Sequence, residues 1–285
     1  MPNKRPLSRN IRPPNLNNKP VQTSCISNLI AIPPDFLTTP SAKPITSTPI
    51  SFSASPLLEY VGHTAILLAN VLSPEECQHL IALAEASVVK QHPEESPWKP
   101  ALVSMGPGWE VAAPSYRDSD RIVWDEQAVV DRIWARCAQA EGLSELLAEV
   151  PSKRGEGSGK WTFRGLNNRM RFLKYSPGQY FKPHCDGPYY CTADGHDFRT
   201  HYTVHLYLND SAKESATGEG HVVGATSFLS RDEKRRLDVD PKAGSVLIFQ
   251  HAGLYHEGAR LEAGTKYTVR MDILYKWEQN ELVTL

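Results

Sequence analysis

The sequence predicts an α+β fold that is mainly β, in which polar strand faces line the interior of a rolled-up sheet. Two segments alternate between polar and apolar residues with the period of two that is typical of β-strands. A second observation is a set of metal-ligand residues, His184, Asp186 and His256, whose last member lies far downstream of the first two. A rolled-up sheet would bring these distant segments together, so we expect a barrel-like β core with supporting helices before it.

The N-terminal residues 1–58 differ in composition from the rest of the chain. They hold eleven of the 22 prolines, thirteen Ser or Thr residues and a single acid, Asp35. Such a stretch is expected to bury too little apolar surface to offset its ordering entropy, so we predict a disordered tail. An acid-poor, hydroxyl-rich segment also suits a transit peptide, but its prolines would break an amphipathic helix. The predicted folded domain therefore covers residues 59–285, with its core over residues 165–278.

Two helices are expected near the start of this domain. Ser73 has the features of an N-cap, with Pro74 at the first helical position and Glu76 completing a capping box. The second helix is expected over residues 126–140, where apolar residues recur at helical spacing: Val129, Val130, Ile133, Trp134 and Cys137. We expect both helices to be scaffold that packs against the sheet.

The segment between these helices, residues 98–124, is rich in Pro, Gly, Ser and Tyr and contains a run of charges from Arg117 to Arg121. Two interpretations stay open. The run is either the solvated surface of an ordinary loop, or part of a loop that covers a binding site.

Two later segments carry the strand pattern most clearly. In residues 265–275 one face is Lys266, Thr268, Arg270 and Asp272, and the other is Tyr267, Val269, Met271 and Ile273. In residues 201–208 one face is His201, Thr203, His205 and Tyr207, and the other is Tyr202, Val204, Leu206 and Leu208. A solvent-exposed strand would also alternate, but it rarely gathers His, Tyr, Lys and Arg beside candidate metal ligands. We therefore expect the polar faces to line the barrel and the apolar faces to pack outward against helices.

The candidate ligands form an H-x-D pair, His184 and Asp186, followed by His256. In an extended strand, residues two apart point to the same side and can bind one ion together. Two imidazoles and one carboxylate form the facial triad of non-haem Fe(II) oxygenases, which leaves the other metal positions open. An H-x-D pair alone is weak evidence because short motifs occur by chance, but the polar strand faces favour the metal site. His251, close to His256, is expected to be a hydrogen-bonded turn residue.

Two basic residues share the predicted inner face, Lys266 and Arg270. Fe(II) oxygenases of this type use a dicarboxylate co-substrate, whose distal carboxylate needs a cation inside the barrel. Arg pairs with carboxylates through two parallel hydrogen bonds, whereas Lys acts as a compact point charge. Spacing alone leaves open which of the two binds the co-substrate and which meets the substrate.

Five segments in order resemble the catalytic domain of prolyl 4-hydroxylase-type Fe(II)- and 2-oxoglutarate-dependent dioxygenases. They are residues 171–187, 203–209, 224–228, 241–258 and 264–267, and residues 71–77 resemble the first helix of that domain. The resemblance implies a double-stranded β-helix, or jelly roll, over roughly residues 59–278. It implies hydroxylation of an unactivated C–H bond with release of succinate and CO₂, and Fe(II), 2-oxoglutarate, O₂ and the reductant L-ascorbate as cofactors.

The resemblance also implies roles for individual residues. His184, Asp186 and His256 would be the iron ligands, and Lys266 would bind the 5-carboxylate of 2-oxoglutarate. Further contacts to this co-substrate are expected from Tyr175, Tyr207, Thr203 and Arg270. The sequence departs from the usual pattern at Val223, at His205 and at Arg270. These departures concern the substrate, which could be a protein proline, a free amino acid or a secondary metabolite.

Two other functions were weighed on the same residues. A non-catalytic jelly-roll scaffold would be expected to have lost ligands, whereas the triad and Lys266 are intact. A halogenase needs the carboxylate position vacated for halide, and Asp186 occupies it.

The whole chain sets further expectations. Its net charge is −1 and no basic stripe accompanies aromatic residues, so we expect no nucleic-acid partner. No apolar run approaches the ~20 residues of a membrane span, so no membrane is expected. Five cysteines without a C-x-x-C pair indicate free thiols in a reducing, intracellular compartment, in keeping with a cytoplasmic enzyme. The sequence does not specify an oligomeric state.

Overall fold

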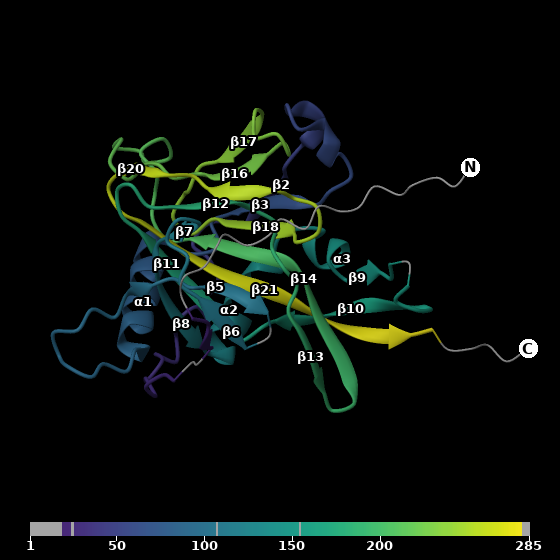
Figure 1. The fold of residues 1–285 in the computed structure, drawn as a ribbon, viewed down its shortest axis with the longest axis horizontal. Helices are drawn as coiled ribbons and strands as arrows, with labels where there is room; N and C mark the ends of the chain where they lie inside the picture. Colours follow the sequence, from purple (N-terminus) through teal and green to yellow (C-terminus); the bar gives the residue numbers. More distant parts are fainter. Residues whose placement is uncertain (1–18, 24–25, 107, 154, 281–285) are drawn as a thin grey trace, which may run out of the picture.

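Two antiparallel sheets dominate the computed structural model, which describes residues 19–23, 26–106, 108–153 and 155–280 (Figure 1). Strand β21 runs through the middle of the larger sheet, between β14 and β11. The order of the larger sheet is β2 (Thr46–Pro49), β3 (Ala65–Ala69), β18 (Val246–Gln250), β14 (His196–Tyr207), β21 (Lys266–Gln279), β11 (Arg169–Tyr175), β8 (Asp120–Asp125) and β4 (Lys99–Pro100).

The smaller sheet packs against one end of the larger one. Its order is β17 (Arg236–Val239), β16 (Thr226–Leu229), β19 (His256–Gly258), β12 (Tyr180–His184) and β7 (Arg117–Asp118). Phe228 of β16 and Phe249 of β18 meet edge to face between the two sheets, with ring centroids 5.6 Å apart. Both rings are buried, so this apolar layer holds the sheets together. The predicted jelly-roll core is confirmed.

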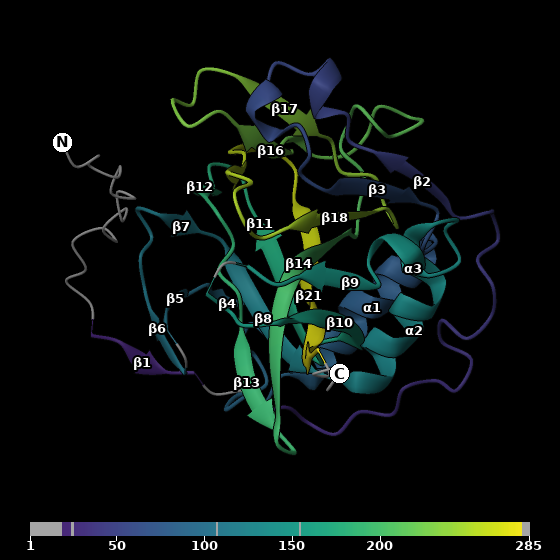
Figure 2. The same ribbon diagram turned by 90° about the vertical axis from the view of Figure 1, so that its right-hand side faces the viewer.

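The helices lie on the outer side of the larger sheet. They are α1 (Pro74–Ser87), α2 (Gln127–Cys137) and the short α3 (Leu143–Leu146). Figure 2 shows all three on one side of β14 and β21, away from β16 and β17. Their buried residues, such as Leu80 and Ile133, share one hydrophobic core with Val204 and Met271 of the sheet. None of the described helices combines the length and the apolarity that crossing a membrane would take.

Local chemistry explains where α1 begins. Ser73 accepts a hydrogen bond from the Glu76 amide, and the Glu76 side chain accepts one from the Ser73 amide, so the predicted capping box is present. In α2 the buried residues Val129, Val130 and Ile133 follow the predicted stripe. Both helices are therefore scaffold, as expected.

Shorter strands complete the fold. Three extend the larger sheet: β9 (Glu149–Pro151), β10 (Gly159–Leu166) and β13 (Tyr190–Ala193). Two small sheets are separate from these. One has the order β1 (Val21–Gln22), β6 (Trp109–Val111) and β5 (Val103–Gly106), and the other pairs β15 (Val222–Val223) with β20 (Leu261–Ala263). The segment 98–124 is thus built from five strands, β4 to β8, and the interpretation of an ordinary surface loop is wrong.

The predicted alternation of β21 is confirmed. Lys266 and Arg270 line an internal cavity, whereas Val269, Met271 and Ile273 join the core beneath the helices. The second alternating segment is only partly as expected. The pairing of β14 with β21 shifts between Thr200 and Tyr202, so His201 turns away from the cavity and packs on Trp161 and Tyr275.

The prediction of disorder over residues 1–58 is wrong for residues 21–22, which form β1, and for residues 26–58, whereas residues 1–18 and 24–25 lie outside the described part. Strand β2 pairs with β3, and Phe36, Leu37, Phe52 and Leu57 are buried. Carbonyl groups of this segment also accept hydrogen bonds from Arg132 and Arg136 of α2. A few well-placed apolar residues and two arginines anchor the segment, although its average composition is that of a disordered chain.

Candidate active site

The two candidate histidine ligands lie opposite each other on neighbouring strands. His184 ends β12 and His256 begins β19, and the two are paired in the register of these antiparallel strands. Asp186 follows β12 in an irregular segment rather than within the strand. The expectation that one strand carries both members of the H-x-D pair is therefore wrong, because β12 ends at His184 and Asp186 lies two residues beyond it.

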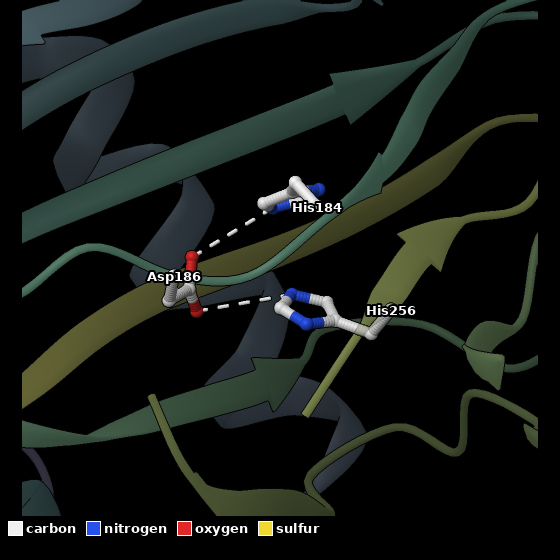
Figure 3. A group of neighbouring side chains, drawn as sticks. All are labelled: His184, Asp186 and His256. Carbon is white, nitrogen blue, oxygen red and sulfur yellow. Dashed lines mark ion pairs between the residues drawn. The ribbon is translucent and has the colours of Figure 1, made fainter. Parts of the chain in front are cut away.

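Figure 3 shows Asp186 reaching toward both imidazole rings. One carboxylate oxygen lies 3.7 Å from Nε2 of His184 and the other lies 3.8 Å from Nε2 of His256. The candidate ligand atoms of all three residues lie within 4.8 Å of one another. One metal ion could therefore contact all three side chains at once.

Hydrogen bonds on the far side of each ring orient the histidines. Nδ1 of His184 lies 2.8 Å from the Lys182 carbonyl, and Nδ1 of His256 lies 3.1 Å from the Leu254 carbonyl. A carbonyl only accepts, so Nδ1 carries the proton in both rings and Nε2 presents its lone pair inward. Metal-binding histidines commonly have this arrangement.

The protonation states also suit metal binding. Desolvation and the neighbouring His256 lower the pKa of His184 to about 3, and desolvation lowers the pKa of His256. Burial alone would raise the pKa of Asp186, but the Arg270 guanidinium and the two histidines hold it well below its usual range. Two neutral imidazoles and one carboxylate are the donor set of a non-haem Fe(II) site, so the residues present fit that metal.

Two cavity residues hold the carboxylate in place. Thr203 of β14 donates a hydrogen bond to Asp186, and Nη2 of Arg270 lies 3.3 Å from the same carboxylate. Arg270 also contacts Asp272 at 3.0 Å. Both residues were expected to contact the co-substrate, and in this structure their polar atoms are directed to Asp186.

Lys266 lies in a different part of the cavity wall. Its Nζ donates to the Gly224 carbonyl at 2.5 Å and lies 5.3 Å from the centre of the Tyr175 ring. It forms no salt bridge with a carboxylate of the described residues, and desolvation lowers the pKa of Lys266 to about 7. A buried amine without an acidic partner is a suitable site for an incoming carboxylate.

Of the two remaining predicted co-substrate residues, the structure brings one to the cavity. Tyr175 lines it together with Thr226. Tyr207 does not, because its hydroxyl donates to Thr226 at 2.8 Å from behind the wall. It therefore supports a lining residue rather than facing the cavity.

The two nearby histidines have different surroundings. His251 lies outside the ligand group, with Nε2 3.4 Å from Asp272. His205 lines the cavity, and its buried Nε2 has no hydrogen-bond partner among the described residues. This geometry agrees with the prediction that His256, and not His251, is the third candidate metal ligand.

Among the cavity residues that the sequence interpretation missed are two arginines, Arg117 of β7 and Arg171 of β11. Arg171 lies directly opposite Arg270 in the pairing of β11 with β21. Arg117 belongs to the charged run that had two open interpretations. With a period of two, Arg117 and Arg121 share one face and Asp118 and Asp120 share the other, and this is the strand signal that could have identified it.

Comparisons with known proteins agree with this chemistry. Residues 170–271 match the family model of the 2OG-Fe(II) oxygenase superfamily, and the match includes all three candidate ligands. A search of curated proteins finds no match.

Among solved structures, a Pseudomonas putida prolyl-4-hydroxylase is 17% identical with a TM-score of 0.47, over 75% of this chain and 95% of that one. The viral collagen prolyl hydroxylase of Paramecium Bursaria Chlorella virus-1 is 17% identical with a TM-score of 0.43, over 74% and 95%. A Trichoplax adhaerens prolyl hydroxylase is 16% identical with a TM-score of 0.46, over 76% and 86%.

Proposed function

We propose that this protein is a prolyl 4-hydroxylase-like enzyme that hydroxylates an unactivated C–H bond. Residues 170–271 belong to the 2OG-Fe(II) oxygenase superfamily, so the chain is a dioxygenase that uses Fe(II), 2-oxoglutarate and O₂. One observation carries this proposal. Nε2 of His184, Nε2 of His256 and the Asp186 carboxylate converge on one point in a cavity that also contains Lys266, which is buried and forms no salt bridge within the described chain.

We assign His184, Asp186 and His256 as the residues that hold iron, through Nε2 of each histidine and a carboxylate oxygen. When bound, the metal with O₂ and 2-oxoglutarate supplies the oxidising power for hydroxylation, with release of succinate and CO₂. The remaining contributions come from the protein itself. The two Nδ1–H groups keep both histidines in one tautomer, and Thr203 fixes the orientation of the carboxylate.

Lys266 is the residue we assign to the distal carboxylate of 2-oxoglutarate. Its ammonium group is buried and has no acidic partner within the described chain, which favours pairing with a bound dicarboxylate. Tyr175 beside it completes this part of the site. Phe249 and Leu173 give the cavity apolar wall, which limits the access of water to the reacting groups.

The class of prime substrate is part of the proposal rather than of the family assignment. A protein proline and a small polar molecule both remain compatible with the site. The four cysteines of the described chain are free thiols, which supports the proposed reducing, intracellular location.

The test is succinate formation from 2-oxoglutarate by the purified protein with Fe(II), O₂ and L-ascorbate. Even without the prime substrate, slow uncoupled turnover should release succinate. Asp186→Ala should abolish it, because the metal loses its only carboxylate ligand. Asp131→Ala is a matched control, since this carboxylate is exposed on α2 and accepts a hydrogen bond from Gln127 of the same helix. Equal succinate formation by natural protein and Asp186→Ala would refute the assignment.

A further inference from the structure

A second group of cations lines the cavity apart from Lys266. Arg117, Arg171 and Arg270 come from three strands, β7, β11 and β21, and all three line the cavity. We refer to these three residues as the arginine cluster. The side chains of Arg171 and Arg270 are 24% and 23% exposed, so the cluster is reachable from the opening of the cavity.

The carboxylates nearby do not balance the arginine cluster. Arg171 and Arg270 share one of them, Asp272, at 2.9 Å and 3.0 Å. The adjacent Glu110 is occupied by Arg121, which donates to both of its oxygens at 2.8 Å. Asp186 also contacts Arg270, but in the proposed enzyme its charge serves the metal.

Arg117 has no acidic partner of its own. Within the described chain it forms no salt bridge, its Nε has no hydrogen-bond partner, and Nη1 reaches only the Leu102 carbonyl at 3.4 Å. The other acidic residue of the cavity wall, Glu257, faces Arg236 at 3.8 Å. Desolvation lowers the pKa of Arg117 to about 10, so the group is still a cation at neutral pH. A partly buried cation with unused donors is costly unless an anion joins it.

The position of Arg117 relates it to the reacting centre. Its guanidinium lies 4.7 Å above the Phe181 ring, and the opposite neighbour of that ring is His184, stacked at 3.8 Å. One aromatic ring thus separates the cation from a candidate metal ligand. An anion bound at Arg117 would therefore lie close to the metal without being a ligand of it.

Lys266 and the arginine cluster lie at different places along the sheet. In the pairing of β11 with β21, Lys266 is opposite Tyr175, whereas Arg270 is opposite Arg171, four residues further along each strand. His205 of β14 is opposite Arg270 on the other side of β21. One dicarboxylate at Lys266 therefore leaves the arginine cluster with its excess positive charge.

From this arrangement we infer that the arginine cluster binds an anionic oxygen group of the prime substrate, with Arg117 as its main contact. The inference rests on the proposed function and narrows its substrate class to molecules that carry a carboxylate or a phosphate. Guanidinium groups suit both anions because they present parallel N–H donors. Arg117 is then a specificity-determining residue.

The test observes the arginine side chains directly by NMR. Protein with ¹⁵N-labelled arginine is loaded with Zn(II) and N-oxalylglycine, an unreactive analogue of 2-oxoglutarate, so that the Lys266 site is filled. Acetate, inorganic phosphate and the neutral acetamide are then titrated in turn. We expect a saturable shift of the Arg117 Nε–H resonance with an anion and none with acetamide. The anion with the lower Kd, acetate or phosphate, identifies the substrate group as a carboxylate or a phosphate.

Variants separate the cluster from general charge effects. Arg117→Gln should raise the Kd of the anion by about tenfold or more, because hydrogen bonds to a charged group are lost. Binding to this variant is measured from the shift of the Arg171 resonance. Arg164→Gln removes the same charge from an exposed position on β10 and should leave the affinity unchanged. Arg117→Lys, which keeps the charge, should have an intermediate affinity and gives a second reading if Arg117→Gln does not fold.

The outcomes are distinct. Absence of an anion-dependent shift at Arg117, or equal affinities of Arg117→Gln and Arg164→Gln, would overturn the inference. Loading is verified beforehand by metal content and by displacement with 2-oxoglutarate. Failure to load would count against the proposed function, and the same titration of the unloaded protein would still test the arginine cluster.

Discussion

Thr203 donates a hydrogen bond from Oγ1 to Oδ2 of Asp186 at 2.5 Å, in a buried part of the cavity wall. Such outer contacts fix the direction in which a ligand presents its lone pairs. Thr203 was expected to contact 2-oxoglutarate, and the structure adds a positioning contact to the proposed iron ligand.

Replacing this threonine tests the positioning role. Thr203→Val keeps the shape of the side chain but removes the donor, and we expect metal affinity to fall by roughly 10–100-fold. Thr203→Ser keeps the hydroxyl and should retain most of the affinity. Calorimetric titration with Mn(II) measures both, and an unchanged affinity in Thr203→Val would exclude the role.

A matched pair of variants separates the two basic residues of β21. Lys266→Met should leave the distal carboxylate of 2-oxoglutarate buried without a cation, at a cost of about 3–5 kcal/mol, which corresponds to roughly two to four orders of magnitude in Kd. Arg270→Met should have a much smaller effect on this Kd, because Arg270 already pairs with Asp186 and Asp272. The Kd of 2-oxoglutarate for each metal-loaded variant is the measurement. A larger loss in Arg270→Met would exchange the two roles.

The low pKa of Lys266 predicts how 2-oxoglutarate binding depends on pH. Desolvation lowers this pKa to about 7 in the free protein, and only the protonated amine attracts a carboxylate. Affinity should therefore be highest below pH 7 and should decrease by about tenfold per pH unit above it, as binding increasingly requires proton uptake. Lys266→Arg is the control, since a guanidinium stays charged and should give a flat profile. A flat profile in the natural protein would contradict the assignment.

A stability prediction concerns the departure from the family pattern at Val223. This β-branched residue has a φ of 63°, in the left-handed region that strongly favours glycine. It is 38% exposed, so little packing is lost on truncation. Val223→Gly should stabilise the protein by roughly 0.5–1 kcal/mol in urea unfolding, because relief of strain exceeds the entropy that glycine adds to the unfolded chain. Val222→Gly, at a neighbouring residue without a positive φ, should destabilise it instead.

Local patterns predicted much of this molecule. The Ser73 capping box specifies where α1 begins, and the alternation around Arg270 specifies which face of β21 is polar, because both signals lie within a few residues of sequence. The candidate ligand group was predicted as well, although Asp186 lies beyond the end of β12 rather than within the strand.

Features that depend on distant contacts were not predictable in the same way. Arg117 becomes a cavity residue only because β7 pairs with β12. In this pairing Arg117 lies opposite Phe181, which is more than sixty positions away in the sequence. The ordered course of residues 26–58 depends on Arg132 and Arg136 of α2. Composition averages over such anchors, and short-range periodicity does not detect them.

A crystal structure of the protein with Mn(II) and N-oxalylglycine tests the central claim most directly. The account predicts one metal ion bound by Nε2 of His184, Nε2 of His256 and the Asp186 carboxylate, with the distal carboxylate of the analogue on Lys266. His251 should remain beside Asp272, away from the metal. A metal ion bound elsewhere, or a distal carboxylate seated on Arg117 instead of Lys266, would contradict it.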